Sequence, residues 1–193
     1  MTRTLPAPSS PPHSPSASPD VPSIRLATPA DAALAATVAR RTFFDAYSGS
    51  DSSPDLQVHM DRHFGERQQA AELTDPATTT LLLEDDAGDT IGYALLGDDP
   101  VPACVTGPAP QQIRRFYVDQ AWKGTGVAQQ LMAAVDAEAR RRGRRTLWLL
   151  AWFRNFRAHA FYRKCGFVEV GTAPYLFGNT EEQDVAMARP TAP

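Results

Sequence analysis

Apolar positions along the chain follow two periods, one of two residues and one of three to four residues. The period of two, or a short continuous apolar run, is typical of β-strands. It occurs in seven segments, at residues 23–26, 79–84, 90–96, 113–119, 146–151, 167–171 and 183–189. The longer period is typical of one face of an amphipathic helix. It occurs in four segments, at residues 29–47, 54–73, 125–142 and 155–166. Strands and helices in this order predict one α/β, or α+β, layered domain.

The first 22 residues differ from the rest of the chain in composition. They contain seven prolines and five serines. Such a segment has too little apolar surface to offset the conformational entropy that folding removes. We therefore expect residues 1–22 to be a disordered tail and residues 23–193 to form the folded domain.

The composition of the whole chain excludes several classes of protein. Hydrophobic residues make up 42% and charged residues 21% of the 193 positions, as in a soluble globular protein. The longest apolar run, Leu147 to Phe153, is far shorter than the roughly 20 residues of a membrane-spanning helix. The net charge of -3 provides no overall positive field for nucleic acid or anionic lipid. We therefore expect a cytoplasmic protein whose partners include neither a membrane nor a nucleic acid.

The cysteines and histidines indicate no metal site. Cys104 and Cys165 lack the paired spacing of metal ligands, and we expect both to be reduced thiols. His59 and His63 stand four positions apart, where a helix could present both to a metal, but Met60 interrupts the HExxH pattern. We expect these two histidines to lie on a solvated face.

A glycine-containing junction between a strand and a helix is the first candidate site. Strand residues Tyr117 and Val118 lead through Lys123, Gly124 and Gly126 into an amphipathic helix. Backbone N–H groups at the start of a helix lack intrahelical partners, and the helix dipole favours an anion there. The segment therefore predicts a phosphate-binding loop, with a tight turn as the alternative. It lacks the third glycine of a dinucleotide fingerprint, and its lysine precedes both glycines, unlike the lysine of a nucleotide triphosphatase loop.

A second motif follows the apolar strand at residues 146–151. It comprises Asn155, a good helix cap, and the series Ala-x-x-Phe-Tyr-x-Lys-x-Gly-Phe, which begins at Ala158 and ends at Phe167. Together with the upstream Lys-Gly-x-Gly-x-Ala loop, this motif resembles those of the GNAT N-acetyltransferases. The likeness covers residues 23–189.

The amino-terminal half adds a narrower likeness. The segment Thr42-Phe43-Phe44 and the strand around Tyr93 are similar to the bacterial spermidine/spermine-type acetyltransferases. The wider resemblance implies a GNAT-like acyl-CoA N-acyltransferase fold, with a mixed, mostly antiparallel seven-stranded sheet and about four helices. It also implies that the fourth and fifth strands splay apart, so that acetyl-CoA enters between them as the co-substrate. No metal is implied.

The resemblance assigns contacts with acetyl-CoA to both motifs. The pyrophosphate would lie on the loop and first helical turn, which comprise Lys123, Gly124, Thr125, Gly126, Val127, Ala128 and Gln129. Main-chain groups of Tyr117 and Val118 would pair with the pantetheine arm, which Asn155 would also contact. Tyr162 would lie near the thioester sulfur, and Phe161 would face the core. The alternatives for Asn155 and Tyr162 are a helix cap and a buried aromatic side chain.

Acetyl transfer to an amine needs a proton acceptor and a proton donor. An alkyl ammonium with a pKa of about 10.4 must lose a proton before its lone pair can attack a thioester, and the departing thiolate leaves more readily when it is protonated. Tyr162 is the expected catalytic donor. Relatives of the narrower type commonly carry a carboxylate shortly after the fifth strand, where this chain has Phe153. Glu84 is therefore the first alternative for the catalytic base, followed by Asp85 or a bound-water relay.

The sequence leaves the acceptor open between a small-molecule amine, such as a polyamine, and a protein amine. Asp45, Asp51, Asp55 and Asp61 are candidates either for a cationic amine pocket or for solvated helix faces. Five arginines within residues 140–145 either cap a helix C-terminus or contact the ribose phosphate of coenzyme A. A non-catalytic acyl-CoA-binding or sensing module of the same fold is the alternative function. If the chain associates, we expect a homodimer.

Overall fold

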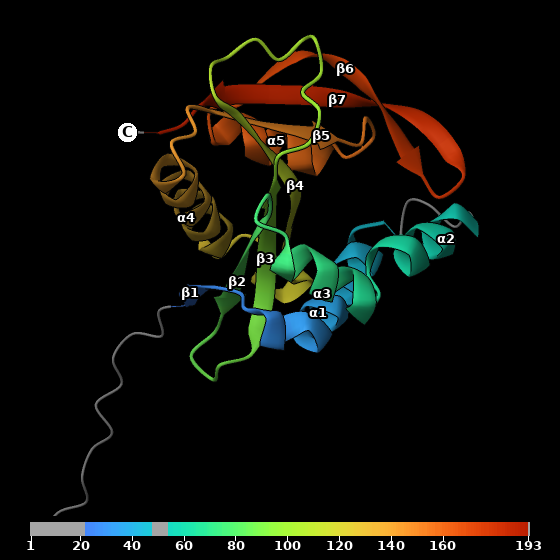
Figure 1. Ribbon diagram of the computed structural model, residues 1–193, viewed down its shortest axis with the longest axis vertical. Coiled ribbons are helices and arrows are strands. Elements are labelled where there is room, and N and C mark those ends of the chain that lie inside the picture. Colours follow the sequence, from blue (N-terminus) through green and yellow to red (C-terminus); the bar gives the residue numbers. More distant parts are fainter. Residues whose placement is uncertain (1–21, 48–53, 193) are drawn as a thin grey trace, which may run out of the picture.

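The computed structural model describes residues 22–47 and 54–192, and its centre is one seven-stranded sheet (Figure 1). Residues 1–21 of the predicted tail lie outside the described residues. The strand order is β1-β2-β3-β4-β5-β7-β6. Neighbouring strands are antiparallel except β4 and β5, which are parallel. The predicted mixed, mostly antiparallel sheet is therefore confirmed.

The strands lie where the alternating pattern predicts them. Their bounds are β1 (Ser23–Leu26), β2 (Thr79–Glu84), β3 (Thr90–Gly97), β4 (Pro110–Val118), β5 (Thr146–Ala151), β6 (Val168–Phe177) and β7 (Thr180–Pro190). The last two strands form a longer hairpin than predicted, with pairs from Val168 and Ala188 to Phe177 and Thr180. Pro174 hid this extension in the sequence, because proline is unfavourable in a central strand but is tolerated in an edge strand such as β6.

The described residues contain five α-helices. Their bounds are α1 (Ala32–Tyr47), α2 (Pro54–His63), α3 (Glu66–Thr74), α4 (Val127–Arg141) and α5 (Phe156–Lys164). Two 3-10 turns, η1 (Pro29–Asp31) and η2 (Gln120–Trp122), precede α1 and α4. The helix predicted from residue 54 to residue 73 is two helices, because the extended backbone of Gly65 separates α2 from α3.

Helices cover both faces of the sheet. Figure 1 shows α4 on one side of the central strands and α1, α2 and α3 on the other. Strand β2 shows how the alternating sequence produces two cores. Leu81 and Leu83 pack in the cluster that contains Leu131 of α4, whereas Leu82 packs in the cluster that contains Phe43 of α1. Each face therefore has its own apolar layer.

Strands β4 and β5 separate soon after they begin. They pair only where residues 110–112 meet residues 146–148. Beyond this point β4 pairs with β3 alone and β5 with β7 alone, so the facing main chain of residues 114–118 has no strand partner within residues 22–47 and 54–192. Arg114 is the extra residue of a β-bulge at this point, and bulges increase local bending. The predicted splay of the fourth and fifth strands is confirmed.

Two buried ion pairs connect helices to the sheet. Arg189 of β7 donates to both carboxylate oxygens of Asp136 in α4, with N–O distances of 2.9 and 2.5 Å. Arg115 of β4 donates to both carboxylate oxygens of Glu72 in α3, at 2.6 and 2.9 Å. Each arginine makes two parallel bonds, a geometry that fixes the orientation of both partners.

Candidate active site

A cleft of about 370 Å³ opens where β4 and β5 splay apart. Its walls come from α1, β4, the loop before α4, the end of β5 and α5. Eight of the residues assigned to acetyl-CoA line it, namely Tyr117, Val118, Lys123, Gly124, Ala128, Gln129, Asn155 and Tyr162. The other three assigned residues, Thr125, Gly126 and Val127, lie in the same turn without lining the cleft, and Val127 is buried in the core.

The glycine loop turns the chain into α4 through two left-handed residues. Gly124 and Gly126 have φ angles of +94° and +99°, a region that residues with a Cβ rarely adopt. The first α4 amides to find a main-chain acceptor are those of Gln129 and Gln130, which both donate to the Gly126 carbonyl. The amides of Val127 and Ala128 come before this point, where a helix offers no intrahelical acceptor. The turn therefore presents the N-terminus of a 15-residue helix beside the cleft.

Basic side chains contribute positive charge to the cleft. Lys123, Arg157 and Lys164 all line the cleft. Burial lowers the pKa of Lys123, and the nearby charge of Arg157 lowers it further. The Lys123 ammonium donates to Gln120 Oε1 at 2.7 Å. The positive charges and the helix N-terminus together favour an anion at this end of the cleft.

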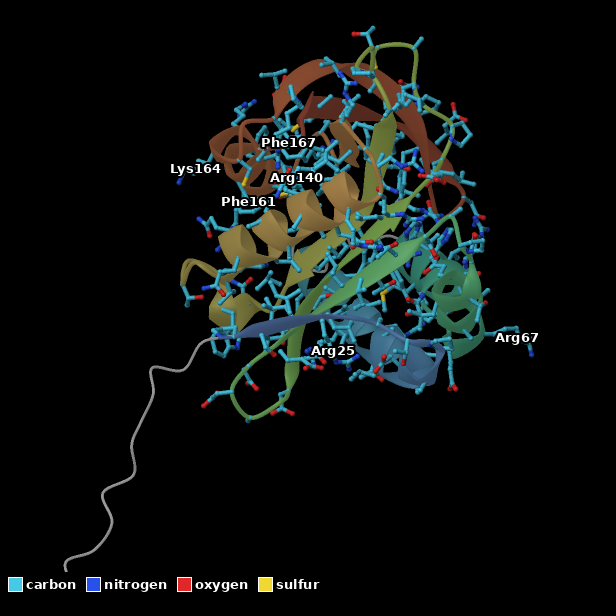
Figure 2. The ribbon with its side chains drawn as sticks, turned by 60° about the vertical axis from the view of Figure 1, so that its left-hand side comes forward. Arg25, Arg67, Arg140, Phe161, Lys164 and Phe167 are labelled. Carbon is cyan, nitrogen blue, oxygen red and sulfur yellow. The ribbon has the colours of Figure 1, made fainter. Side chains whose placement is uncertain are left out.

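The arginine cluster at residues 140–145 does not reach the cleft. Arg141 pairs with Glu138, Arg144 with Asp98, and Arg142 donates to Thr79 and Pro76. Figure 2 shows Arg140 near the end of α4, where it donates to the Ala192 carbonyl. Arg140, Arg142 and Arg144 join the end of α4 to neighbouring segments, and Arg141 pairs within the helix, which supports the helix-capping interpretation rather than a contact with ribose phosphate.

Helix α5 positions Tyr162 in the cleft. The Asn155 side chain accepts from the Ala158 N–H at 3.1 Å, so the predicted N-cap is confirmed. Tyr162 is only 9% exposed, and burial raises the pKa of its hydroxyl. The hydroxyl therefore stays protonated through neutral pH. Phe161 packs against the core cluster as expected, and it also lines the cleft, where it stacks on Phe116 at a centroid distance of 5.4 Å.

Glu84 and Asp85 lie away from this arrangement. Glu84 accepts from Arg25 Nε at 2.7 Å, and neither acid lines the cleft. Figure 2 shows Arg25 well separated from Phe161. Asp85 accepts from the Ala87 and Asp89 amides and so shapes the turn after β2. The structure therefore does not bring the predicted base to Tyr162.

The aspartates of the first helices do not line the cleft either. Asp55 accepts from Asn179 N–H and Thr180 Oγ1, and Asp61 accepts from Arg40 and Gln57. Asp45 is exposed, and Asp51 lies outside the described residues. The solvated-face interpretation therefore describes Asp45 and Asp61, and Asp55 holds the turn between β6 and β7.

The expectation of a solvated face is wrong for His59. Its ring is 3% exposed, stacks on Phe43 at 5.0 Å and lies 4.4 Å from the ring of His63. Burial is the main reason why its pKa is lowered to about 3. No group of three or more possible metal ligands occurs within residues 22–47 and 54–192. Nor does this part of the chain contain a helix long and apolar enough to cross a membrane.

One carboxylate that the sequence did not single out lies next to the cleft. Asp184 of β7 lines a small cavity of about 10 Å³ with Glu182 and four aromatic side chains, Tyr47, Trp152, Tyr175 and Phe177. Tyr47 and Trp152 line the cleft as well. Asp184 lies within residues 183–189, which the sequence predicted as a strand, but that prediction did not show which side chains of α1, β5 and β6 surround it. The alternation of Glu182 and Asp184 on one strand face was the available signal.

The family model and the similar proteins found by comparison agree on one family. The model of the Acetyltransferase (GNAT) family matches residues 40–167. An uncharacterized N-acetyltransferase of Mycobacterium bovis is 33% identical over 161 residues, which cover 82% of this chain and 97% of that protein. The aminoglycoside N(6')-acetyltransferase type 1 of Stenotrophomonas maltophilia is 33% identical over 157 residues, or 80% and 92% of the two chains.

The fold is also found in solved structures. The PaiA N-acetyltransferase of Thermoplasma acidophilum, crystallised in complex with coenzyme A, superposes with a TM-score of 0.69 at 16% identity. The match covers 88% of this chain and 99% of that one. At this identity the likeness concerns the fold.

Proposed function

The chain belongs to the GNAT acetyltransferase family and is an acyltransferase, and we propose that it transfers an acetyl group from acetyl-CoA to a primary amine. One observation carries the proposal. The cleft between β4 and β5 joins a helix N-terminus, the unpaired main chain of β4 and the Tyr162 hydroxyl in one space. These are the groups that a long anionic thioester needs for its phosphates, its arm and its sulfur.

The residues of the cleft fit acetyl-CoA at both ends. Gly124 on the cleft wall, with Gly126 beside it in the same turn and the first turn of α4, offers backbone N–H groups to the pyrophosphate, and Lys123 and Arg157 add positive charge. The main chain of Tyr117 and Val118, without a partner on the β5 side, offers hydrogen bonds to the amide groups of the pantetheine arm. Bound acetyl-CoA would supply an activated acyl group at its thioester.

Tyr162 is the residue we assign to the leaving group. The amine nitrogen forms a bond with the carbonyl carbon, and the bond from that carbon to sulfur breaks. The sulfur then takes the Tyr162 proton, and the proton lost by the amine as the amide forms returns to the tyrosinate through solvent. Burial keeps Tyr162 in its protonated form, which is the form a donor needs. Main-chain N–H groups of the splayed β4 segment are candidates to stabilise the developing negative charge on oxygen.

Relatives suggest which amines to test first. The Stenotrophomonas relative is named as an aminoglycoside N(6')-acetyltransferase, and the sequence of this chain has a narrower likeness to spermidine/spermine-type enzymes. Both kinds of acceptor carry primary amines that are positively charged at neutral pH. We therefore propose a small cationic amine as the acceptor, with a protein amine as the second choice.

The test is amine-dependent thiol release. Purified full-length protein with acetyl-CoA should release coenzyme A faster when spermidine, n-butylamine, kanamycin or a peptide with a free N-terminal amine is added. Mass spectrometry should then find the acetylated amine. Binding of acetyl-CoA in calorimetry without transfer to any of these amines would contradict the proposal and favour a non-catalytic acyl-CoA-binding module.

A further inference from the structure

The cavity beside the cleft has the chemical character of a cation site. Tyr47, Trp152, Tyr175 and Phe177 form aromatic walls, with Tyr47 and Trp152 ring centroids 5.6 Å apart and Tyr47 and Phe177 centroids 5.8 Å apart. Asp184 and Glu182 supply two carboxylates. Aromatic faces and carboxylates both attract an alkyl ammonium group. A space of about 10 Å³ is at the lower limit for one water-sized group, which is also the size of a primary ammonium.

Asp184 is a buried carboxylate without an ion-pair partner in the part of the chain that the structure describes. It is 4% exposed, and its Oδ1 has no hydrogen-bond partner among the described residues. Neither Asp184 nor Glu182 forms an ion pair with any cation in the described ranges 22–47 and 54–192. Burial of an unpaired carboxylate destabilises a protein, so such groups are usually paired or neutralised. An external cation would remove this penalty.

The topology places Asp184 next to the reacting end of the cleft. The last pair between β5 and β7 joins Ala151 to Val185, so Trp152, the residue that follows β5, lies beside Asp184. Ala151 and Trp152 line the cleft together with Tyr162. Burial is the main reason why the pKa of the Tyr47 hydroxyl is raised, and the nearby charges of Asp184 and Tyr162 raise it further, so Tyr47 lies within electrostatic reach of both. The cavity and the proposed proton donor therefore share one aromatic wall.

We propose that Asp184 binds the ammonium group of the acceptor in this cavity and accepts its proton, which makes a positively charged alkylamine the acceptor class. This inference rests on the proposed acetyl transfer. The carboxylate takes one proton from the ammonium and becomes a carboxylic acid, and the nitrogen lone pair becomes available for attack on the thioester carbon. Asp184 then returns its proton to solvent after the product leaves.

The surroundings of Asp184 favour this role at neutral pH. Burial, and then the nearby charge of Glu182, raise the pKa of Asp184 to about 6. The other titratable groups around it are Tyr47 of α1 and Tyr175 of β6, and burial raises the pKa of both above the ordinary value. Arg114 and Arg115 of β4 act on Tyr175, and Arg115 is itself paired with Glu72. Asp184 is thus ionised at pH 7 and is more basic than an ordinary aspartate.

The experiment compares Asp184→Asn with Glu181→Gln. Glu181 lies three residues away on the same strand, is exposed and does not line the cavity, so its substitution removes one carboxylate without touching the site. The acceptor is the member of the panel above that the wild-type protein acetylates fastest. The rate of thiol release is measured from pH 5 to pH 10, and amine binding to the protein is measured by calorimetry.

A base at this position predicts three results. For the wild type, kcat/KM falls as the pH drops below about 6, because Asp184 becomes protonated. At pH 7, Asp184→Asn turns over about 100-fold to 10,000-fold more slowly and binds the amine at least about 10-fold more weakly. Its defect shrinks as the pH approaches the amine pKa of about 10.4, because the amine then loses its proton to water. Glu181→Gln behaves as the wild type.

Two outcomes would overturn the inference separately from the proposed function. Turnover by Asp184→Asn within about threefold of the wild type at pH 7 would exclude the base, as would a slow variant whose pH profile has the wild-type shape. An unchanged affinity for acetyl-CoA shows that the variant is folded. If the wild type transfers acetyl to no amine, the proposed function fails and this inference fails with it.

Discussion

Tyr47 of α1 and Trp152 at the end of β5 lie 5.6 Å apart between ring centroids and form a wall shared by two spaces. On one side is the cleft that contains Tyr162, and on the other is the cavity that contains Asp184. An acyl donor in the first space and an ammonium in the second would meet at this wall. The proposed proton donor, Tyr162, and the proposed proton acceptor, Asp184, would then lie on opposite sides of the reacting atoms.

Asp184 should lower the stability of the fold at neutral pH. Its pKa is higher in the folded protein than in the unfolded chain, so the folded state binds the proton more tightly. The free energy of unfolding therefore decreases as the pH rises from about 4 through 6. We expect Asp184→Asn to be more stable than the wild type by roughly 1–3 kcal/mol at pH 7 and by much less at pH 4.

Denaturant unfolding at the two pH values measures this difference. Glu181→Gln is again the control, because its carboxylate is exposed and its loss should change stability little at either pH. A loss of stability in Asp184→Asn at pH 7 would show that the carboxylate is satisfied in the folded protein.

Gly126→Val should weaken binding of acetyl-CoA. A valine at φ +99° strains the turn, and its side chain stands at the helix N-terminus that we assign to the pyrophosphate. We expect at least about a 10-fold loss of affinity in calorimetry, with a stability loss of about 1–2 kcal/mol.

Gly143→Val is the matched control for this variant. Gly143 follows the opposite end of α4 and has a φ of +72°. At Gly143, as at Gly126, a Cβ would meet no atom of another residue within 4 Å, apart from its chain neighbours and the backbone of its own helix. The control should show a similar stability loss with unchanged affinity. Equal loss of acetyl-CoA affinity in the two variants would attribute the effect to helix strain rather than to the site.

Asp136→Ala should destabilise the protein strongly. The substitution leaves the buried Arg189 guanidinium without its two carboxylate bonds, and removal of one partner from a buried pair typically costs about 3–5 kcal/mol. Urea unfolding measures the loss. The double variant Asp136→Leu with Arg189→Met should recover a large part of it, because no buried charge remains. A double variant as unstable as Asp136→Ala would show that packing, rather than charge, explains the effect.

Local patterns in the sequence predicted most of the fold. The alternating pattern in β2 and the apolar face of α4 predicted the layered arrangement. The Asn155 cap predicted where α5 begins. The glycine loop was found because its conformation depends on Gly124 and Gly126 themselves. These features depend on residues that are close together in the sequence, so periodicity and capping preferences are enough to predict them.

The proton acceptor could not be found in this way. Glu84 was chosen from its place at the end of a strand, but β2 lies two strands away from β4, and Glu84 pairs with Arg25 there. Asp184 acquires its properties from long-range pairing, since β7 lies between β5 and β6 in the sheet. The strand that carries Asp184 was predicted at residues 183–189, but its pairing with Ala173 of β6, next to Pro174, was not. The environment of a buried carboxylate depends on elements far apart in the chain, and no local pattern encodes it.

The single-turnover rate of acetyl transfer in Tyr162→Phe tests the central claim most directly. The substitution keeps the ring in its buried position on α5 and removes only the hydroxyl, so folding and acetyl-CoA affinity should match the wild type. With acetyl-CoA bound and a saturating amine, we expect the rate to fall about 100-fold to 10,000-fold, the usual contribution of a general acid. A rate within about threefold of the wild type would contradict the account, and Tyr162 would then be an aromatic wall of the cleft.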